Sequence, residues 1–238
     1  MYIFTDGSTI NNGKKYAVGG IGVYSPNQTI NNIEYPEYKL NYSLAGNSTI
    51  KVTNQISELI AAILAIEHAI KISKGDTIYV YTDSSYVINC ATNWCNSWIN
   101  NNWKKSNGKI IDNLWLVYRL VQLTKKYPVF FKHVKAHTQE PENKSDEKYL
   151  LWLGNNIVDK LAQESSQCLL NKSDKVKTLK WDAFANLLIK GMTNDIKVGL
   201  PFINEINEFY KKLLEQNNVV NNVVNNVVDN VVDNVVDI

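Results

Sequence analysis

The hydrophobic and polar positions at the start of the chain follow the pattern of short β-strands separated by turns. Tyr2 to Thr5, Ala17 to Tyr24 and Tyr38 to Leu44 are rich in β-branched and aromatic residues or alternate between apolar and polar positions. Ser25-Pro26-Asn27 supplies turn chemistry after the second stretch. This spacing predicts two hairpins of an antiparallel meander, with the first strand ending at Asp6.

A helical pattern follows from Ser57 to Ile72, where apolar residues recur three and four positions apart. Thr53 or Asn54 is suited to cap this helix, which places Glu58 in the first turn, where an acid favours the helix dipole. A strand is predicted from Thr77 to Tyr81. Because it follows a strand and a helix, we expect it to run parallel to the first strand.

The second half of the chain continues the α/β pattern. Helices are predicted over Tyr86 to Trp98, Asn113 to Lys126 and Asn155 to Ser166. A last strand is predicted from Val129 to Val134, and a long polar loop from Lys135 to Lys148 separates it from the last of these helices.

The character of the chain changes after about residue 170. Short amphipathic helices are predicted over Trp181 to Ile189 and Phe202 to Leu214. Val219 to Ile238 repeats Val-Val with Asn-Asn or Asp-Asn. This tract is compatible with a drifting helical stripe, with associating β structure or with little fixed structure, and the sequence leaves these alternatives open.

The composition of the chain excludes some classes of protein but does not indicate a function. The 238 residues are 45% hydrophobic with a formal net charge of +2, so any basic surface must be local. Cys90, Cys95 and Cys168 form no C-x-x-C pair, and we expect reduced thiols that serve packing in an intracellular protein. Asp6 comes too early for a signal peptide, and no apolar run is long enough to span a membrane. We therefore expect a soluble cytoplasmic or nuclear monomer with no membrane contact and no obligate protein partner.

Candidate chemistry lies at four carboxylates. Asp6 and Asp83 each follow a threonine at a predicted strand end, and parallel neighbouring strands would bring both to one edge of the sheet. Glu58 and Asp159 are acids in apolar helical contexts. Each also has an ordinary interpretation: a turn former for either aspartate, a dipole partner for Glu58 and an exposed helix charge for Asp159. Carboxylates brought together repel one another, and a dication relieves that repulsion. Oxygen ligands favour Mg²⁺ or Mn²⁺ over zinc, and two such ions suit phosphodiester chemistry.

Five motifs, in this order, resemble those of type 1 ribonuclease H, whether cellular or viral. The motifs are Phe4-Thr5-Asp6-Gly7-Ser8, Thr53-Asn54-Gln55 with Glu58-Leu59, Tyr81-Thr82-Asp83-Ser84, Val134-Lys135-Ala136-His137, and Gly154-Asn155-Asn156 with Asp159-Lys160-Leu161-Ala162. The resemblance implies a ribonuclease H-like mixed sheet of five strands, three antiparallel and then parallel, flanked by helices. It implies a catalytic domain over residues 1–168, a helical extension of unknown role over 169–216 and a low-complexity tail over 217–238. Because the chain begins at the first strand, we expect no separate N-terminal hybrid-binding domain.

The resemblance also implies an activity. It implies an endonuclease that cleaves the RNA strand of RNA–DNA hybrids and leaves 5′-phosphate and 3′-hydroxyl ends, with two Mg²⁺ ions for which Mn²⁺ substitutes. Matched residue by residue, His137 resembles the mobile histidine that assists proton transfer or product release, and the metal-binding carboxylates are Asp6, Glu58, Asp83 and Asp159. His68 and His133 match no motif, and we expect them to be structural.

The same resemblance predicts contacts with the hybrid. The expected substrate-binding residues are Gly7, Ser8, Asn54, Gln55, Ser84, Trp94, Trp103, Lys104 and Asn155. Gly7 allows close approach of the RNA backbone, and the amide of Asn155 suits a 2′-hydroxyl. Trp94 and Trp103 suit the DNA strand, although packing between helices is the competing interpretation for both and the favoured one for Trp98.

The chain departs from the family pattern in three places, one of which is Asn156, at a position where an acid is common in the family. The region around Trp103 carries fewer basic residues than the more cationic members, which predicts weaker salt dependence of hybrid binding. His137 and Asn155 are further apart than in the family, and Glu140 to Leu153 looks like an insertion.

Two other functions remain open at the level of sequence. One is a binding module or assembly factor that uses this fold without catalysis. The other is a different nuclease of the wider superfamily, such as an integrase or a junction resolvase, although these lack the Thr53-Asn54-Gln55 pattern that precedes Glu58.

Overall fold

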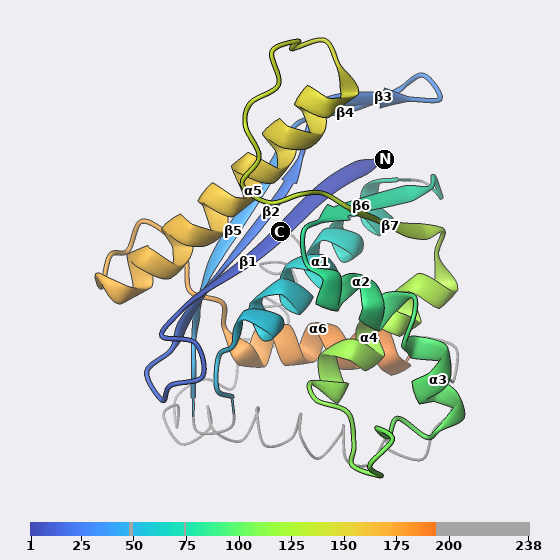
Figure 1. Ribbon diagram of the computed structural model, residues 1–238, viewed down its shortest axis with the longest axis vertical. Helices are drawn as coiled ribbons and strands as arrows, with labels where there is room; N and C mark the ends of the chain where they lie inside the picture. The colour runs from blue at the N-terminus through green and yellow to red at the C-terminus, as the bar shows by residue number, and fades with distance from the viewer. Residues whose placement is uncertain (48–49, 74, 194–238) are drawn as a thin grey trace, which may run out of the picture.

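Figure 1 shows the computed structural model of the protein, which describes residues 1–47, 50–73 and 75–193. Its centre is a five-stranded sheet in the order β5-β2-β1-β6-β7. β1, β2 and β5 are antiparallel, and β6 and β7 continue the sheet parallel to β1. This confirms the predicted mixed sheet. The strands are β1 Tyr2–Ile10, β2 Val18–Ser25, β5 Tyr38–Ala45, β6 Ile78–Thr82 and β7 Val129–His133.

A small hairpin of β3 Gln28–Ile30 and β4 Ile33–Tyr35 was not predicted from the sequence. Asn31 and Asn32 both have positive φ angles, 51° and 62°, as the tightest two-residue hairpin turns require. Its strands are three residues long, too short to show an alternating pattern.

One face of the sheet is covered by α1 Asn54–Ile72, α2 Ser85–Ala91 and α4 Leu114–Lys126 (Figure 1). Thr53 caps α1 by accepting a hydrogen bond from the backbone N–H of Ile56, and the long apolar face of α1 is buried against β1 and β2. The helix predicted over Tyr86 to Trp98 is two helices, α2 and α3 Cys95–Asn100. Thr92 and Asn93, poor helix formers, lie between them.

The opposite face is covered by α5 Glu147–Leu170, which crosses β1, β2 and β5 (Figure 1). A Cβ atom at Gly20 or Gly22 of β2 would collide with the backbone of α5, so these glycines let the helix lie directly on the strand. α5 was predicted to begin at Asn155, but it begins about two turns earlier. Asp146 caps this earlier start by accepting from the N–H of Lys148.

The helix α6 Trp181–Thr193 packs against the same core as the sheet and contacts α4. Trp181 and Phe184 are buried and lie edge-on to Trp115. The indole N–H of Trp181 also donates to the carbonyl of Ala45, at 2.6 Å. Residues before and after position 168 in the sequence therefore contribute side chains to one core. The predicted helix over residues 202–214 and the repeat over 219–238 lie outside the described residues.

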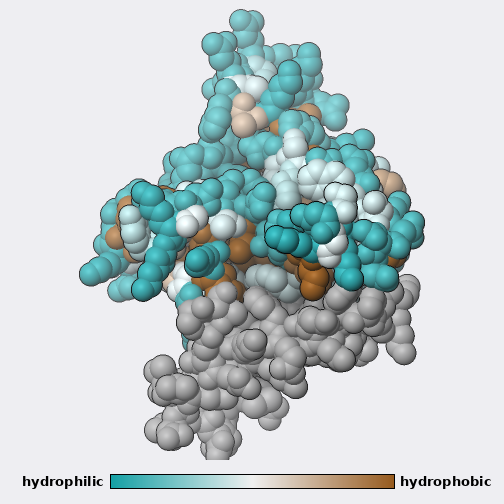
Figure 2. Space-filling model, turned by 60° about the horizontal axis from the view of Figure 1, so that its bottom comes forward, coloured by the Kyte–Doolittle hydropathy of each residue, from teal (hydrophilic) through white to brown (hydrophobic). Residues whose placement is uncertain are grey.

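Hydrophilic side chains predominate over most of the described surface in Figure 2, and hydrophobic ones show in a few smaller areas. All three cysteines are free, and Cys90 and Cys95 are buried. Among the helices that the structure describes, none is both long and apolar enough to cross a membrane.

Candidate active site

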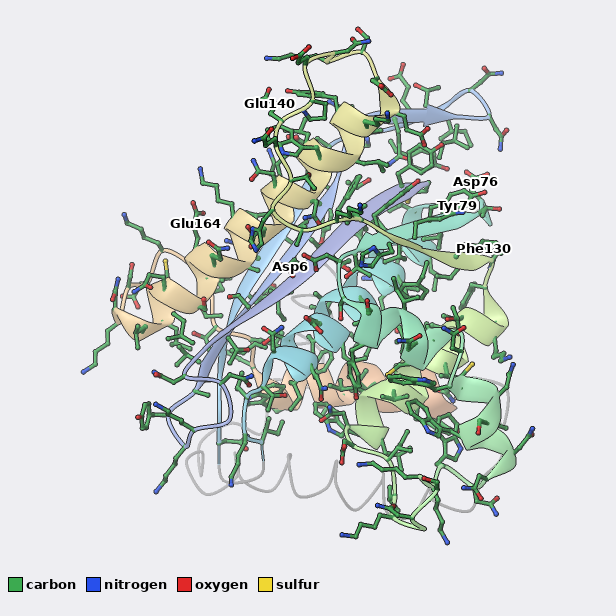
Figure 3. The ribbon with its side chains drawn as sticks, viewed as in Figure 1. Asp6, Asp76, Tyr79, Phe130, Glu140 and Glu164 are labelled. Carbon is green, nitrogen blue, oxygen red and sulfur yellow. The ribbon has the colours of Figure 1, made fainter. Side chains whose placement is uncertain are left out.

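The register of the sheet brings Asp6 and Asp83 together. Phe4 and Tyr81 form the last pair of the parallel ladder between β1 and β6, and each aspartate follows two positions later on its own segment. Both side chains therefore belong to the same face. The prediction that β1 ends at Asp6 is wrong: pairing with β2 carries the strand on to Ile10. Asp6 instead lies where β1 has lost its parallel neighbour, and Figure 3 shows it between α5 and the helices of the other layer.

Glu58 is fixed by a hydrogen bond on each carboxylate oxygen. The side-chain amide of Asn54 donates to Oε1 at 2.7 Å, and the hydroxyl of Ser84 donates to Oε2 at 2.6 Å. The predicted position of Glu58 in the first helical turn is wrong, because α1 already begins at Asn54 and no acid occupies its first turn. The extra turn gives Asn54 a place from which to hold Glu58.

Asp159 completes the set from α5. Its Oδ1 accepts a hydrogen bond from the side-chain amide of Gln163, one turn further along the helix. Its Oδ2 lies 4.0 Å from Nδ1 of His137, whose side chain is 79% exposed. The structure therefore brings the histidine and the fourth carboxylate together across the long loop.

Burial and the neighbouring carboxylates raise the pKa values of three of these acids. Burial, and then the charge of Asp83, raise the pKa of Asp6 to about 8, with Asp159 and Glu58 adding to the shift and the N–H of Gly7 opposing it. Burial raises the pKa of Glu58 to about 7, which the Ser84 hydroxyl opposes and Asp83 reinforces. Burial and Asp159 raise the pKa of Asp83, while His133 and His137 oppose that shift. His133 matched no motif, and its only sequence signal is its place at the end of the last strand, opposite Thr82.

This donor set fits divalent cations. Within the described residues, no three His, Cys, Asp or Glu side chains already enclose a point at which an ion would sit. The four carboxylates nevertheless offer oxygen ligands, which Mg²⁺ and Mn²⁺ prefer. A cation among them would relieve the repulsion that raises the pKa of Asp6.

Three residues predicted to contact the hybrid also have internal partners. A Cβ atom at Gly7 would collide with the backbone of Glu58, so the glycine lets α1 approach β1. The Ser8 hydroxyl donates to the carbonyl of Ala162 and contacts the Ser166 hydroxyl, at 2.8 and 2.7 Å, and so ties β1 to α5. The Ser84 hydroxyl is engaged by Glu58 and by the cap of α2. All three therefore position the elements that carry the carboxylates.

The predicted aromatic contacts separate into one buried and one exposed residue. Trp103 is 1% exposed and packs against Tyr118, so its predicted contact with DNA is wrong and the packing interpretation holds. Trp94 is 39% exposed and contacts Tyr86 and Trp98.

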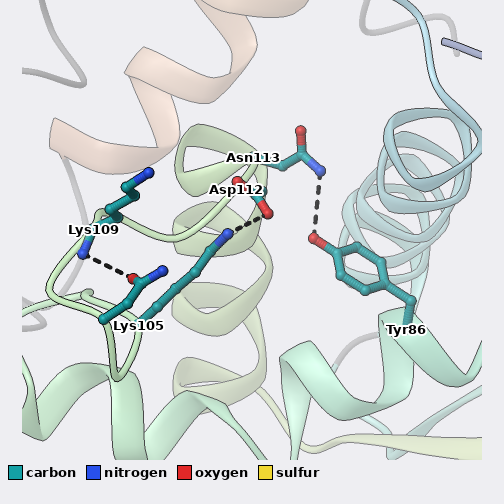
Figure 4. Close-up of polar contacts among 6 residues, drawn as sticks. Tyr86, Lys105, Lys109, Asp112 and Asn113 are labelled. Atoms are coloured by element: carbon teal, nitrogen blue, oxygen red, sulfur yellow. Dashed lines mark hydrogen bonds and ion pairs between the residues drawn. The ribbon is translucent and has the colours of Figure 1, made fainter.

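Two polar contacts hold the loop that follows Trp103, one within the loop and one to α2, as Figure 4 shows. Lys105 pairs with Asp112 at 2.6 Å, and Asn113 donates to the hydroxyl of Tyr86 at 3.3 Å. Lys104, at the start of this loop, is exposed, as is Gln55 at the start of α1. Asn155 is buried and lines a cleft beside His137.

A mixed five-stranded sheet with acids on β1, on α1, directly after β6 and on α5 defines the ribonuclease H-like class of α/β proteins. The sequence model of the RNase H family matches residues 1–167, and the chain belongs to this family.

Named relatives agree with this assignment. Ribonuclease H of Clostridium botulinum (strain Hall) is 34% identical over 166 residues, which are 69% of this chain and 94% of that protein. Human Ribonuclease H1 is 32% identical over 168 residues, 70% of this chain and 50% of the human protein. Ribonuclease H of Schizosaccharomyces pombe is 36% identical over 141 residues, 59% of this chain and 48% of the yeast protein. The chain thus matches about half the length of the human and yeast relatives.

Solved structures show the same fold. The native protease–reverse transcriptase of prototype foamy virus superposes with a TM-score of 0.53 at 25% identity, over 69% of this chain and 20% of the viral one. LC9-RNase H1, a type 1 RNase H, superposes with a TM-score of 0.50 at 23% identity, over 70% of this chain and 71% of that chain.

Proposed function

We propose that this chain is an endonuclease that hydrolyses the RNA strand of RNA–DNA hybrids and leaves 5′-phosphate and 3′-hydroxyl ends. The observation that carries the proposal is that Asp83, Asp159 and Glu58, from three other segments of the chain, all lie close enough to Asp6 for their charges to raise its pKa. Buried acids that raise one another's pKa values weaken a fold unless they serve a bound cation or a reaction. Membership of the RNase H family supplies the substrate class.

Asp6, Glu58, Asp83 and Asp159 would hold two Mg²⁺ ions, for which Mn²⁺ substitutes. When bound, such ions would supply charge to activate a water and to stabilise the leaving oxygen of a phosphodiester. Asp6 and Asp83, which share a face of the sheet, would be central to holding the ions. Asn54 and Ser84 keep both oxygens of Glu58 oriented, and His137 would move a proton beside Asp159.

Recognition of the hybrid would rest on polar groups near the acids and on one exposed aromatic ring. Asn54, Gln55 and Asn155 offer amides for the sugars of the RNA strand, whose 2′-hydroxyls distinguish it from DNA. Trp94 and Lys104, both exposed, combine a stacking surface with a positive charge for the other strand. We further propose that the protein acts as a monomer. We propose that it works inside the cell, since three free thiols, two of them buried, are typical of a reducing compartment.

The test is cleavage of a labelled RNA–DNA hybrid by the full chain and by Asp83→Asn. We expect Mg²⁺-dependent cutting of the RNA strand that the variant slows at least about 1000-fold, since bound metal ions contribute several kcal/mol to such reactions. The thermal unfolding of the variant should remain cooperative. Equal rates for variant and wild type would refute the assignment. Binding without cleavage in both Mg²⁺ and Mn²⁺ would indicate a binding module, and preference for branched DNA another nuclease.

A further inference from the structure

The segment between His137 and Asp159 contains an insertion, Glu140 to Leu153, that the family pattern does not predict. Lys135 to Asp146 form an exposed loop, and Glu147 to Leu153 form the first two turns of α5. Figure 3 shows this loop, with Glu140 labelled on it, running beside the beginning of α5. The insertion therefore extends the helix that carries Asp159 as well as lengthening the loop.

Contacts within the insertion hold the loop against the helix. The indole N–H of Trp152 donates to the carbonyl of Thr138 at 3.0 Å. The rings of Trp152 and Tyr149 lie 5.6 Å apart, and Lys144 lies 5.8 Å from the centre of the Tyr149 ring. Lys144 also pairs with Glu140, at 3.7 Å. Of these contacts, only the bond from Trp152 reaches the residue next to His137.

Trp152 and His137 line the same cleft. Thr138, Asn155 and Asp159 complete this part of its wall. His137 has a φ of 50°, a left-handed conformation that a residue with a side chain adopts at a cost unless its neighbours hold it. The His137 side chain itself is largely exposed, and the bond from Trp152 restrains the backbone beside it.

We infer that Trp152 is a positioning residue for His137. Its hydrogen bond holds the carbonyl of Thr138, the residue after the histidine, and so keeps the imidazole beside Asp159. The inference rests on the proposed function, because it assigns the extended helix a part in the same reaction. It explains how the chain retains a helper histidine on a loop longer than the family's.

The test compares two tryptophan-to-phenylalanine variants of the full chain. Trp152→Phe keeps a ring against Tyr149 but removes the donor to Thr138. Trp181→Phe is the matched control, because its indole N–H also donates to a backbone carbonyl, that of Ala45, remote from the carboxylates. We expect Trp152→Phe to lower kcat about fivefold with little change in KM, as the loss of one net hydrogen bond predicts. Trp181→Phe should lower the melting temperature and leave kcat unchanged.

Two further measurements separate positioning from a general structural role. Hydrogen exchange of the amides around His137 should quicken in Trp152→Phe and not in Trp181→Phe. In a His137→Ala background, Trp152→Phe should lower kcat no further, because its effect passes through the histidine. Unchanged exchange around His137, or independent effects in the double variant, would overturn the inference. The exchange measurement needs no activity, so failure of the proposed function leaves this test intact.

Discussion

The hydroxyl of Ser84 donates a hydrogen bond of 2.6 Å to Oε2 of Glu58 and so joins the end of β6 to helix α1. The hydroxyl oxygen of Ser84 also accepts a hydrogen bond from the N–H of Val87 and so caps α2. Ser84→Ala removes both bonds. We expect a loss of about 1 kcal/mol in the free energy of unfolding from the lost cap, and roughly tenfold weaker binding of divalent cations because Glu58 is no longer oriented.

Urea unfolding and calorimetric titration with Mn²⁺ measure the two effects of Ser84→Ala separately. Ser85→Ala is the control, since Ser85 is exposed and adjacent. Metal affinity that is the same in Ser84→Ala and Ser85→Ala would show that the bond to Glu58 has no part in cation binding.

The raised pKa of Asp6 predicts a pH-dependent stability of the metal-free protein. Since folding raises this pKa from its usual value of about 4 to about 8, the folded state binds the proton more tightly than the unfolded state. This contribution to stability is complete below about pH 4 and is lost as the pH rises towards about 8. Glu58, with a pKa of about 7, acts in the same direction.

Melting temperatures in the presence of a chelator, measured from about pH 5 to about pH 8, check this prediction. Asp6→Asn should lose less stability than the wild type as the pH rises, because it removes the charge that becomes unfavourable. Mg²⁺ should restore stability to the wild type chiefly at the higher pH. Parallel pH profiles for the two proteins would contradict the prediction.

Gly7 is required by the approach of α1 to β1, so its replacement should disturb the fold. Gly7→Ala sets a Cβ atom against the backbone of Glu58, and we expect it to unfold well before the wild type in urea. Gly13→Ala is the comparison, because space is open around Gly13 and only its φ of 75° opposes a side chain, at about 1–2 kcal/mol. A smaller loss of stability in Gly7→Ala than in Gly13→Ala would exclude this role.

Trp94 and Trp103 have different roles despite their similar sequence surroundings. Trp103→Ala should cost about 3–5 kcal/mol of stability, since it empties a buried site. Trp94→Ala should leave stability nearly unchanged and raise the Kd for a hybrid about tenfold, if a base or sugar stacks on the exposed ring. Unfolding curves and fluorescence anisotropy measure both variants, and unchanged affinity in Trp94→Ala would remove this residue from the interface.

Much of the fold follows from local pattern, because apolar residues at a period of two or of about 3.6 mark the strands and helices of the sheet domain. The four carboxylates emerge from motifs whose order resembles a known family, and strand register explains why two of them meet. The cap at Thr53 was one of the two predicted, but the helix then begins at Asn54, which puts Glu58 one turn later than the predicted first turn.

The roles that sequence did not reveal depend on partners far along the chain. Ser8 contacts Ser166, 158 positions away, so nothing in its own motif indicates that its hydroxyl is occupied. Trp103 packs on Tyr118 of another helix, and the exposed or buried state of an aromatic ring follows from such packing rather than from neighbours in sequence. The start of α5 was placed too late because Glu147 and Lys148 were assigned to the polar loop and Tyr149 to Leu153 to an insertion.

A domain boundary at residue 168 predicts that the extension after it can be removed. The packing of α6 against the core predicts instead that its removal destabilises the protein. Trp181, Phe184 and Leu188 are buried in the core that the sheet and α4 form. We expect a chain ending at residue 170 to aggregate or to unfold at a lower urea concentration than the full chain, because it exposes the core face of α4. Phe184→Ala tests the same contact without a deletion and should cost about 3–5 kcal/mol. Full stability in both proteins would show that the extension is separable from the domain.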